Sequence, residues 1–342
     1  MVKKPKVGSI IFILTPTKIK YMSVKKLSFL IIFISFLLSF HLHAQNLQYP
    51  YPVKYFNVNI DGQDSKMAFM DIKPANPNSQ SVILFHGKNF TGFYWKEVIA
   101  FLSDAGFRVI VPDQLGWGLS TKPNAKYSFE MLAQNNMKLL DSLQIDKVNV
   151  IGHSMGGMLA TRFALMYPEK TNKLILEDPL GLEDYKKFIP YRTMEQQYKK
   201  ELSATYASYK KYQQTYYPVW KPEYEQYVIA QAGPLQQKDF ASVAWINALT
   251  YQMIYEQPVL YDLSKLNVPT LLLVGQLDRT VVGKDMLPAK KQKLYGNYPV
   301  LASNAGKKIK NCKVVILPGV GHVPHIQSIG MFRKSVLSFL LH

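Results

Sequence analysis

The chain has 342 residues and 48% of them are apolar, so it can form one large α/β domain with an insertion or two ordinary domains, and global disorder is excluded. Its formal net charge of +18 invites a nucleic-acid-binding interpretation, but the sequence has no zinc-ligand spacing, no aromatic RNA-recognition motif and no basic-region helix. Because the lysines are scattered, we expect a solvated surface and no nucleic-acid partner, with an anionic envelope or substrate as the alternative.

The first segment has the parts of an export signal. Lys25 and Lys26 precede the apolar run Leu27–Leu42, and Ala44 supplies a small residue before Gln45. The run has 16 residues, fewer than the roughly 20 needed to span a bilayer. We therefore expect cleavage after Ala44, a periplasmic or secreted protein and no stable membrane insertion after signal cleavage; an uncleaved anchor is the alternative.

Residues 1–44 hold seven lysines and no acidic residue, so their removal lowers the net charge from +18 to +11. Residues 1–21 lie upstream of an ordinary signal sequence, and Met22 as the start would give a signal peptide of usual length.

From Lys54 onward, short apolar runs alternate with longer amphipathic stretches. Two alternating runs, Lys54–Ile60 and Lys66–Ile72, predict an antiparallel pair around the turn Asp61-Gly62. Six runs rich in Val, Ile and Leu predict strands buried on both faces of a parallel sheet: Ser81–Phe85, Arg108–Val111, Lys147–Ile151, Lys173–Leu176, Thr270–Val274 and Lys313–Leu317.

Helical stretches lie between most of these strands: Tyr94–Ala105, Phe129–Leu143, Met155–Tyr167 and Val282–Tyr295, with Ile326–Leu341 at the end. This alternation predicts an α/β fold in which helices flank a mostly parallel, eight-stranded sheet.

The interval between Leu176 and Thr270 is too long for a simple crossover and contains 13 of the 22 tyrosines. Three runs in it predict helices: Tyr185–Ser203, Tyr206–Tyr217 and Glu223–Tyr255, with breaks at Pro218, Pro222 and Gly233-Pro234. We expect residues 182–265 to form a helical cap inserted into a core made of residues 45–181 and 266–342.

The segment Gly152-His153-Ser154-Met155-Gly156 follows an apolar strand and precedes a helical stretch. This is the G-x-S-x-G pattern in the context that it requires, because its glycines permit a strained strand-to-helix turn that exposes the serine oxygen. We interpret Ser154 as a nucleophile; an ordinary strand–helix turn is the alternative.

A serine hydroxyl needs a base to become nucleophilic. His322 lies in a glycine-rich loop after the last strand, at the sheet edge where ligands bind in open α/β folds. His325 follows Pro324 and is expected to begin the last helix with a structural role. We therefore choose His322 as the base.

The acid that orients the base should follow a strand between the serine and the histidine. Asp278 comes directly after the run Thr270–Val274 and is our first choice; its task is to fix the imidazole tautomer and stabilise the imidazolium. Glu177 and Asp178, after the preceding strand, are the alternatives.

Two backbone N–H groups should form an oxyanion hole. We assign them to Met155, next to the nucleophile, and to Lys88 in the loop after the third strand, with Asn89 as the alternative. We expect His86, Gly87, Asn89 and His153 to contribute to substrate binding.

The single cysteine, Cys312, can form no internal disulfide, and no cysteine cluster supports a metal site, so we expect neither a metal nor a cofactor.

From about residue 50 to residue 342 the sequence resembles the α/β-hydrolase superfamily in its form with a helical cap. The resemblance rests on His86-Gly87 after a strand, on the segment from Asp113 to Ser120, on Gly152–Gly157, on Asp278 and on Gly321-His322. It implies a hydrolase, and the family includes carboxylesterases, lactonases, carbon–carbon bond hydrolases and aminopeptidases. Ser154 argues against the epoxide hydrolases and haloalkane dehalogenases, which use an aspartate nucleophile. The stretch after His86-Gly87 departs from the proline-containing versions of the family.

These features together predict an exported, cofactor-free serine hydrolase that acts on a small acyl substrate, most simply a carboxylic ester. Cleavage of a carbon–carbon bond, lactone or amide by the same triad is the first alternative. A binding protein that keeps the fold without catalysis is the second. The aromatic cap, whose only arginine is Arg192, is expected to favour uncharged substrates with an apolar or aromatic group.

Overall fold

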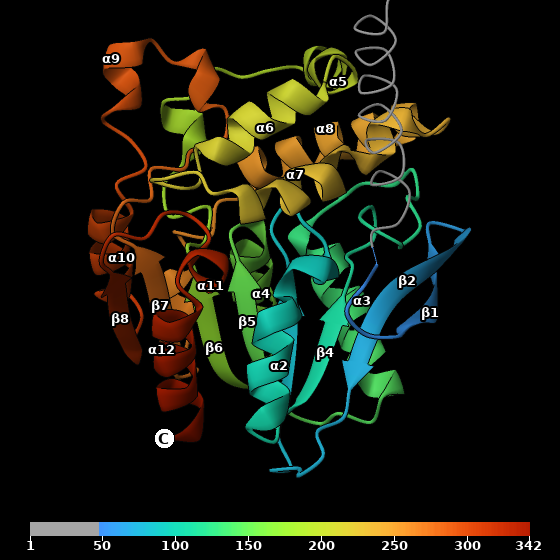
Figure 1. The fold of residues 1–342 in the computed structure, drawn as a ribbon, viewed down its shortest axis with the longest axis vertical. Helices are drawn as coiled ribbons and strands as arrows, with labels where there is room; N and C mark the ends of the chain where they lie inside the picture. Colours follow the sequence, from blue (N-terminus) through green and yellow to red (C-terminus); the bar gives the residue numbers. More distant parts are fainter. Residues whose placement is uncertain (1–47) are drawn as a thin grey trace, which may run out of the picture. The chain divides into compact units, whose positions relative to one another are not determined.

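The computed structural model describes residues 48–342 and has an eight-stranded sheet at its centre (Figure 1). The strand order is β1-β2-β4-β3-β5-β6-β7-β8, and all neighbouring pairs from β4 to β8 are parallel, whereas β1–β2 and β2–β4 are antiparallel. The strands are β1 Val53–Ile60, β2 Gln63–Ile72, β3 Ser81–Phe85, β4 Arg108–Pro112, β5 Val148–His153, β6 Thr171–Glu177, β7 Thr270–Gly275 and β8 Cys312–Leu317. The predicted mostly parallel, eight-stranded sheet is confirmed.

Residues 1–44, on which we predicted the export signal, lie outside the described part of the chain. Within residues 48–342, no helix combines the length and apolar character needed to cross a membrane.

The hairpin between β1 and β2 has a two-residue turn, because Ile60 pairs with Gln63. Asp61 and Gly62 both have positive φ, 50° and 81°, which is the turn geometry that matches the twist of antiparallel strands. The sequence predicted this turn from its Asp-Gly pair.

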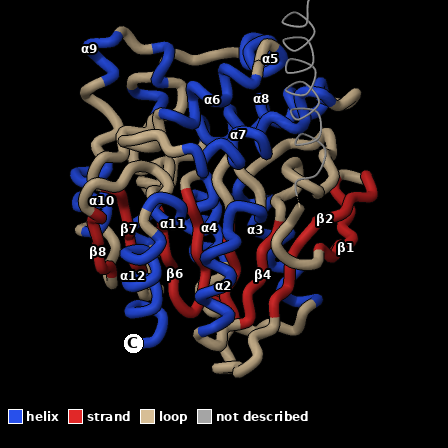
Figure 2. The backbone as a smooth tube through the Cα atoms, viewed as in Figure 1, coloured by secondary structure: helices blue, strands red, loops and turns tan. Residues whose placement is uncertain are grey.

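Helices cover both faces of the sheet (Figure 2). One face packs against α3 (Phe129–Ser142), α4 (Met155–Met166) and α10 (Tyr298–Gly306), and the other against α2 (Lys96–Asp104) and α12 (Ile329–Leu341). Alternate side chains of β3 enter the two cores, so its residues from Val82 to Phe85 are all apolar and buried.

The predicted helix Val282–Tyr295 is wrong as a single element. The structure has a 3₁₀ turn, η6 (Lys284–Met286), and a four-residue helix, α9 (Ala289–Gln292), separated by Leu287 in an extended conformation. Pro288 explains the break, since proline disfavours a helical conformation of the residue before it. The helix α10 that follows was not predicted.

The last predicted helix is also divided. Pro324–Gln327 forms the short helix α11, and Ser328, with φ −146° and ψ 61°, separates it from α12.

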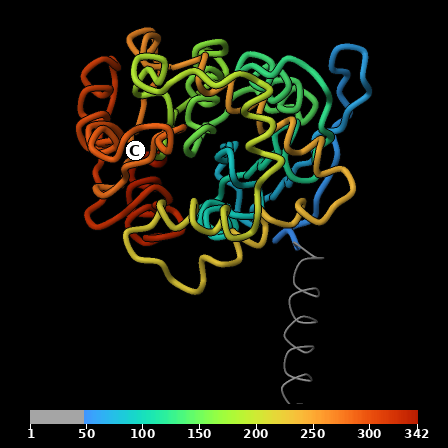
Figure 3. Tube along the Cα trace, turned by 90° about the horizontal axis from the view of Figure 1, so that it is seen from above, coloured from blue at the N-terminus to red at the C-terminus, as the bar shows by residue number. Residues whose placement is uncertain are grey.

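Helices α5 to α8 lie beyond the carboxyl ends of the parallel strands, and Figure 3 shows the chain between residues 200 and 250 running across that edge. The elements between β6 and β7 are η2 Tyr185–Lys187, α5 Met194–Leu202, α6 Tyr206–Gln214, η3 Pro222–Tyr224, α7 Glu225–Ala232, η4 Gly233–Gln236, α8 Phe240–Glu256 and η5 Leu263–Lys265. The division of the chain at residues 182 and 265 stays a sequence-based prediction, and "cap" below denotes residues 182–265.

Breaks occur at the three predicted places in the cap, because Pro218 lies between α6 and η3, Pro222 opens η3, and Gly233-Pro234 opens η4. The run Tyr185–Ser203 is not one helix, since Pro190 lies in the extended segment between η2 and α5.

Candidate active site

Ser154 lies at the sharp turn between β5 and α4. Its backbone has φ 58° and ψ −119°, a sparsely populated conformation for a residue with a side chain. The turn needs glycine on both sides: a Cβ at Gly152 would come within 2.1 Å of the Gly156 carbonyl, and one at Gly156 within 2.1 Å of the Phe85 carbonyl. The local sequence therefore dictates this turn, which presents the serine at the carboxyl edge of the sheet.

His322 connects Ser154 to Asp278. Its Nε2 is 3.0 Å from Ser154 Oγ, and its Nδ1 is 2.7 Å from Asp278 Oδ2. Both His322 and Asp278 are almost fully buried, and they come from the loops after β8 and β7. A carboxylate that accepts a hydrogen bond from Nδ1–H keeps the proton on Nδ1 and leaves Nε2 free to accept the serine proton, so the arrangement can perform nucleophilic catalysis.

Asp278 keeps its negative charge despite its burial. Burial on its own raises the pKa of the Asp278 carboxyl, but contacts with His322 and hydrogen bonds from Asp178 and Thr280 lower it below its usual value. The backbone N–H of Thr280 donates to Asp278 Oδ1 at 2.8 Å. The carboxylate can therefore accept the hydrogen bond from the imidazole Nδ1–H and stabilise a positive charge on that ring.

Asp178, one of the alternative acids, is adjacent to Asp278 and does not replace it. It accepts the backbone N–H of Gly275 at 3.0 Å and 3.2 Å, and burial with the nearby Asp278 charge raises its pKa well above the usual value. Two buried carboxyl groups this close cannot both ionise. Asp178 is therefore protonated and donates its proton toward Asp278.

Asp178, Asp278 and His322 are also the one group within residues 48–342 with three potential metal ligands close together. The 2.7 Å separation of His322 Nδ1 and Asp278 Oδ2 is that of a direct hydrogen bond. Two ligands about 2.1 Å from a tetrahedral ion stand further apart. The geometry fits a hydrogen-bonded catalytic group better than a metal site.

The second alternative acid, Glu177, pairs with His325. Both Glu177 oxygens are 2.9 Å from His325 Nδ1, and the His325 backbone N–H donates to the same carboxyl at 2.8 Å. Burial raises the pKa of Glu177 to about 7 and lowers that of His325 well below its usual value. His325 Nδ1 is thus held by Glu177, and its ring stacks on Trp95 at 4.2 Å, so His325 makes no contact with Ser154 or Asp278 among the hydrogen bonds of residues 48–342.

His153 lies beneath the site and links three of its parts. The Gly87 N–H donates to Tyr94 Oη at 2.9 Å, Tyr94 Oη is 3.0 Å from His153 Nδ1, and His153 Nε2 is 2.7 Å from the His322 carbonyl. Burial lowers the pKa of His153 to about 3, so the ring is neutral. Because Nε2 faces a carbonyl it carries the proton, and Nδ1 accepts the tyrosine hydroxyl.

The loop after β3 and the start of α4 each leave a backbone N–H group free to stabilise a negatively charged oxygen. The Gly87 N–H is occupied by Tyr94, whereas the backbone N–H groups of Lys88 and Met155 have no acceptor in the part of the chain that the structure describes. Trp117 Nε1 donates to the Lys88 carbonyl at 2.8 Å and fixes that peptide. Met155 begins α4, whose positive dipole end also favours negative charge there.

A cavity of about 260 Å³ opens onto Ser154 between the core and the cap. The residues that line it include Lys88 and Asn89 from the core and Gln197, Glu201, Tyr209, Tyr212, Tyr216 and Tyr251 from the cap. Of the predicted substrate-binding residues, only Asn89 lines it. His86, Gly87 and His153 lie behind the wall, and His86 Nε2 accepts the Gln114 N–H at 3.0 Å.

The charged groups around the cavity are paired. Lys88 Nζ is 3.6 Å from Glu201, and Lys200 Nζ is 2.8 Å from Asp285. A substrate in this cavity therefore meets hydroxyl, amide and aromatic groups and compensated charges.

Two residues of the site had no signal in the sequence, Tyr94 and Tyr216. Tyr94 bonds to the loop after β3 and to His153, and Tyr216 bonds to Asn89 across a sequence separation of 127 residues. Each is one tyrosine among 22, and only the folded chain distinguishes them.

Known proteins that are similar to this chain include hydrolases. A family model described as alpha/beta hydrolase fold matches residues 80–328. The crystal structure of a probable hydrolytic enzyme from Pseudomonas aeruginosa PAO1 is similar, with a TM-score of 0.84 and 43% identity, covering 86% of this chain and 95% of that one.

Two curated relatives match shorter regions. A poly(3-hydroxyalkanoate) depolymerase from Ectopseudomonas oleovorans is 36% identical over 129 residues, which is 37% of this chain and 44% of the depolymerase. An uncharacterized protein from Mycobacterium tuberculosis is 41% identical over 102 residues, which is 30% of each chain. The match thus spans less than half the length of these curated relatives.

Proposed function

Because the chain belongs to the alpha/beta hydrolase family, we propose that it is a serine hydrolase that cleaves a carboxylic ester or related acyl compound through an acyl-enzyme intermediate. The observation that supports this most directly is the pair of hydrogen bonds that His322 makes, one to Ser154 and one to Asp278. The accessible cavity at Ser154 provides room for a small acyl substrate.

In the proposed reaction, Ser154 Oγ attacks the substrate carbonyl while His322 Nε2 takes its proton. The negative charge on the carbonyl oxygen is stabilised by the N–H groups of Lys88 and Met155. His322 then gives its proton to the leaving alcohol, and the acyl group stays on the serine. Water, deprotonated by His322, releases the acid and restores the serine. Asp278 stabilises the imidazolium in both halves.

The same triad also fits lactone, amide or carbon–carbon bond cleavage, which are the alternatives within this mechanism. A non-catalytic binding protein with the same fold is the remaining alternative. We further propose that the mature protein acts outside the cytoplasm, on the basis of the basic and apolar pattern before Ala44.

A fluorophosphonate probe tests the proposal. The wild-type protein should become covalently labelled at Ser154, with the site identified by mass spectrometry, and Ser154→Ala should not be labelled. A substrate panel of an ester, a thioester, a lactone and an aminoacyl amide would then identify the bond that is cleaved. A folded wild-type protein that resists the probe and hydrolyses no member of the panel would favour the binding-protein alternative.

A further inference from the structure

Tyr216 belongs to the segment after α6, within the cap, yet it contacts the catalytic loops of the core. Its backbone carbonyl accepts the His322 N–H at 2.8 Å, and its hydroxyl accepts a hydrogen bond from the Asn89 side chain at 2.8 Å. The centroids of the Tyr216 and His322 rings are 4.9 Å apart. Tyr216 is 5% exposed and lines the cavity above Ser154.

The contact with His322 fixes the position of the proposed base. The cap holds the N–H of His322 through Tyr216, and the serine turn holds its carbonyl through His153 Nε2. A Cβ at Gly321 would lie 2.2 Å from the Tyr216 carbonyl oxygen, so only glycine allows this approach. The imidazole therefore projects from a backbone that is held on both sides.

The contact with Asn89 fixes the loop that carries the proposed oxyanion donor. Asn89 directly follows Lys88, whose backbone N–H we assign to that role. Lys88 Nζ adds a second link to the cap, at 3.6 Å from Glu201 of α5, and both side chains are mostly buried.

We propose that Tyr216 is a positioning residue through which the cap aligns the base and the oxyanion loop with each other. This inference rests on the proposed serine-hydrolase function. One cap residue connects the two groups that must act on the same carbonyl, one by proton transfer and the other by charge stabilisation. The cap thus completes the catalytic geometry in addition to enclosing the substrate.

The Tyr216→Phe variant isolates the hydroxyl, because it keeps the ring on His322 and the backbone bond to its N–H. Removing the acceptor of Asn89 lets the oxyanion loop move, which weakens an interaction that matters most in the transition state. We expect kcat to fall by at least about threefold, because the hydroxyl loses its hydrogen bonds with both Asn89 and Tyr212, while KM changes less than twofold.

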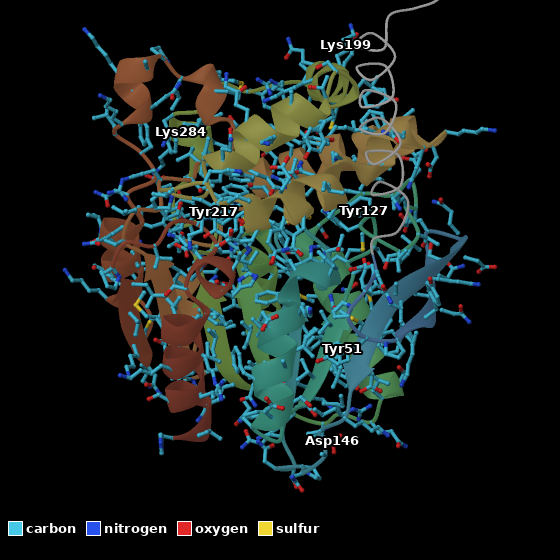
Figure 4. All side chains as sticks on the ribbon, viewed as in Figure 1. Tyr51, Tyr127, Asp146, Lys199, Tyr217 and Lys284 are labelled. Atoms are coloured by element: carbon cyan, nitrogen blue, oxygen red, sulfur yellow. The ribbon has the colours of Figure 1, made fainter. Side chains whose placement is uncertain are left out.

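Tyr217→Phe is the matched control. Tyr217 is the next residue, its ring stacks on Tyr224 at 4.0 Å, and its buried hydroxyl has no partner within residues 48–342. Figure 4 labels it where the cap meets the core. Because removal of this hydroxyl breaks no hydrogen bond, kcat and KM should stay at wild-type values.

A double-mutant cycle with Asn89→Ala completes the test. If Asn89 acts through Tyr216, the double variant should lose no more kcat than the more impaired single variant. The inference is overturned if Tyr216→Phe keeps the kcat of the Tyr217→Phe control, or if the two losses multiply. Labelling of wild-type Ser154 by a fluorophosphonate separates the two proposals: without labelling the serine-hydrolase function itself fails, and with labelling only the positioning role is at stake.

Discussion

Ser154 holds a backbone conformation that costs stability and exposes its hydroxyl to both the cavity and His322. We expect Ser154→Ala to lower turnover by about 10⁴–10⁶-fold, since a catalytic group that works as a unit loses nearly all its rate when one member is removed. The variant should keep its circular-dichroism spectrum and melting temperature. Steady-state kinetics on an active ester would test this, and a variant with a tenth of wild-type turnover would refute the assignment.

His322 and His325 are three residues apart and make different contacts, one with Ser154 and Asp278 and the other with Glu177. We expect His322→Gln to lower turnover by orders of magnitude while the protein still folds. His325→Gln should instead lower the melting temperature, because it leaves the buried Glu177 without its ring partner. Parallel kinetic and thermal-unfolding measurements would decide; a folded, inactive His325 variant beside an active His322 variant would reverse our choice.

His153 predicts a pH dependence of stability. Its pKa of about 3 in the folded protein lies below its value of about 6.5 in an unfolded chain. Between these values the unfolded state binds the proton and the folded state does not, so the free energy of unfolding decreases as the pH falls through this window.

His153→Gln should remove this one contribution, because glutamine can still donate to the His322 carbonyl and does not titrate. The slope of unfolding free energy against pH should decrease by about 1.4 kcal/mol per pH unit near pH 5. Denaturant titrations from pH 4 to 7 would measure it. His86 and His325 are also buried and have lowered pKa values, so in the His153→Gln variant they should still make stability depend on pH. An unchanged slope would mean that His153 is protonated in the folded state.

At the scale of elements, the sequence predicted most strands to within one or two residues. The reason is that each of the strands β3 to β7 has a buried central segment rich in Val, Ile and Leu, which contrasts with the polar residues around it. The serine turn was equally predictable, because its glycines, strand and helix are contiguous in the sequence. The prediction of one helix from Val282 to Tyr295 was wrong, because the spacing of apolar residues suggested one helix, whereas Pro288 separates two short elements.

The partners of the site residues were less predictable than the residues themselves. The order of serine, acid and base follows from strand order, but the choice among Asp278, Asp178 and Glu177 depends on which carboxyl reaches the imidazole. Likewise, the sequence offered His153 as a substrate-binding residue because it lies in the serine motif. The fold instead turns its ring toward Tyr94 and the His322 carbonyl.

The cap should set substrate choice, with a preference for uncharged substrates that carry an apolar or aromatic group. Four tyrosines of the cap line the cavity. The two lysines that line it, Lys88 and Lys200, are paired with Glu201 and Asp285, so an anionic substrate would have to compete with these acids for a cation. Kinetics on neutral and anionic esters of equal size should give a higher kcat/KM for the neutral members.

Two variants assign this preference to the cavity. Tyr209→Ala, in the cavity wall, should reduce the discrimination between aromatic and small acyl groups. Tyr261→Ala is the control, because Tyr261 lies in the cap, is exposed and bonds to Asp184 outside the cavity. A clear preference for anionic esters, or equal effects of the two variants, would contradict the prediction.

At the scale of the whole molecule, the described residues 48–342 form one compact unit of contacts. This unit contains all eight strands of the sheet, from the start of β1 at Val53 to the end of β8 at Leu317. The seven lysines that precede Ala44 carry all of the positive side-chain charge that lies before this unit in the sequence. The mature protein that we propose would therefore be less basic than the full sequence suggests.

The mature protein should begin at Gln45 and lose nothing that the fold requires. The side chain of Tyr49 is hydrogen-bonded to Asp113, so the chain is attached to the core only a few residues after the expected cleavage point. N-terminal sequencing of protein exported by a bacterial host should therefore give Gln45, and a protein made directly from Gln45 should match its melting temperature and kcat/KM. An intact Lys25–Leu42 segment in the membrane fraction would instead indicate an anchored protein. A cleaved product that begins after Tyr49 should melt at a lower temperature, because the hydrogen bond to the buried Asp113 would be lost.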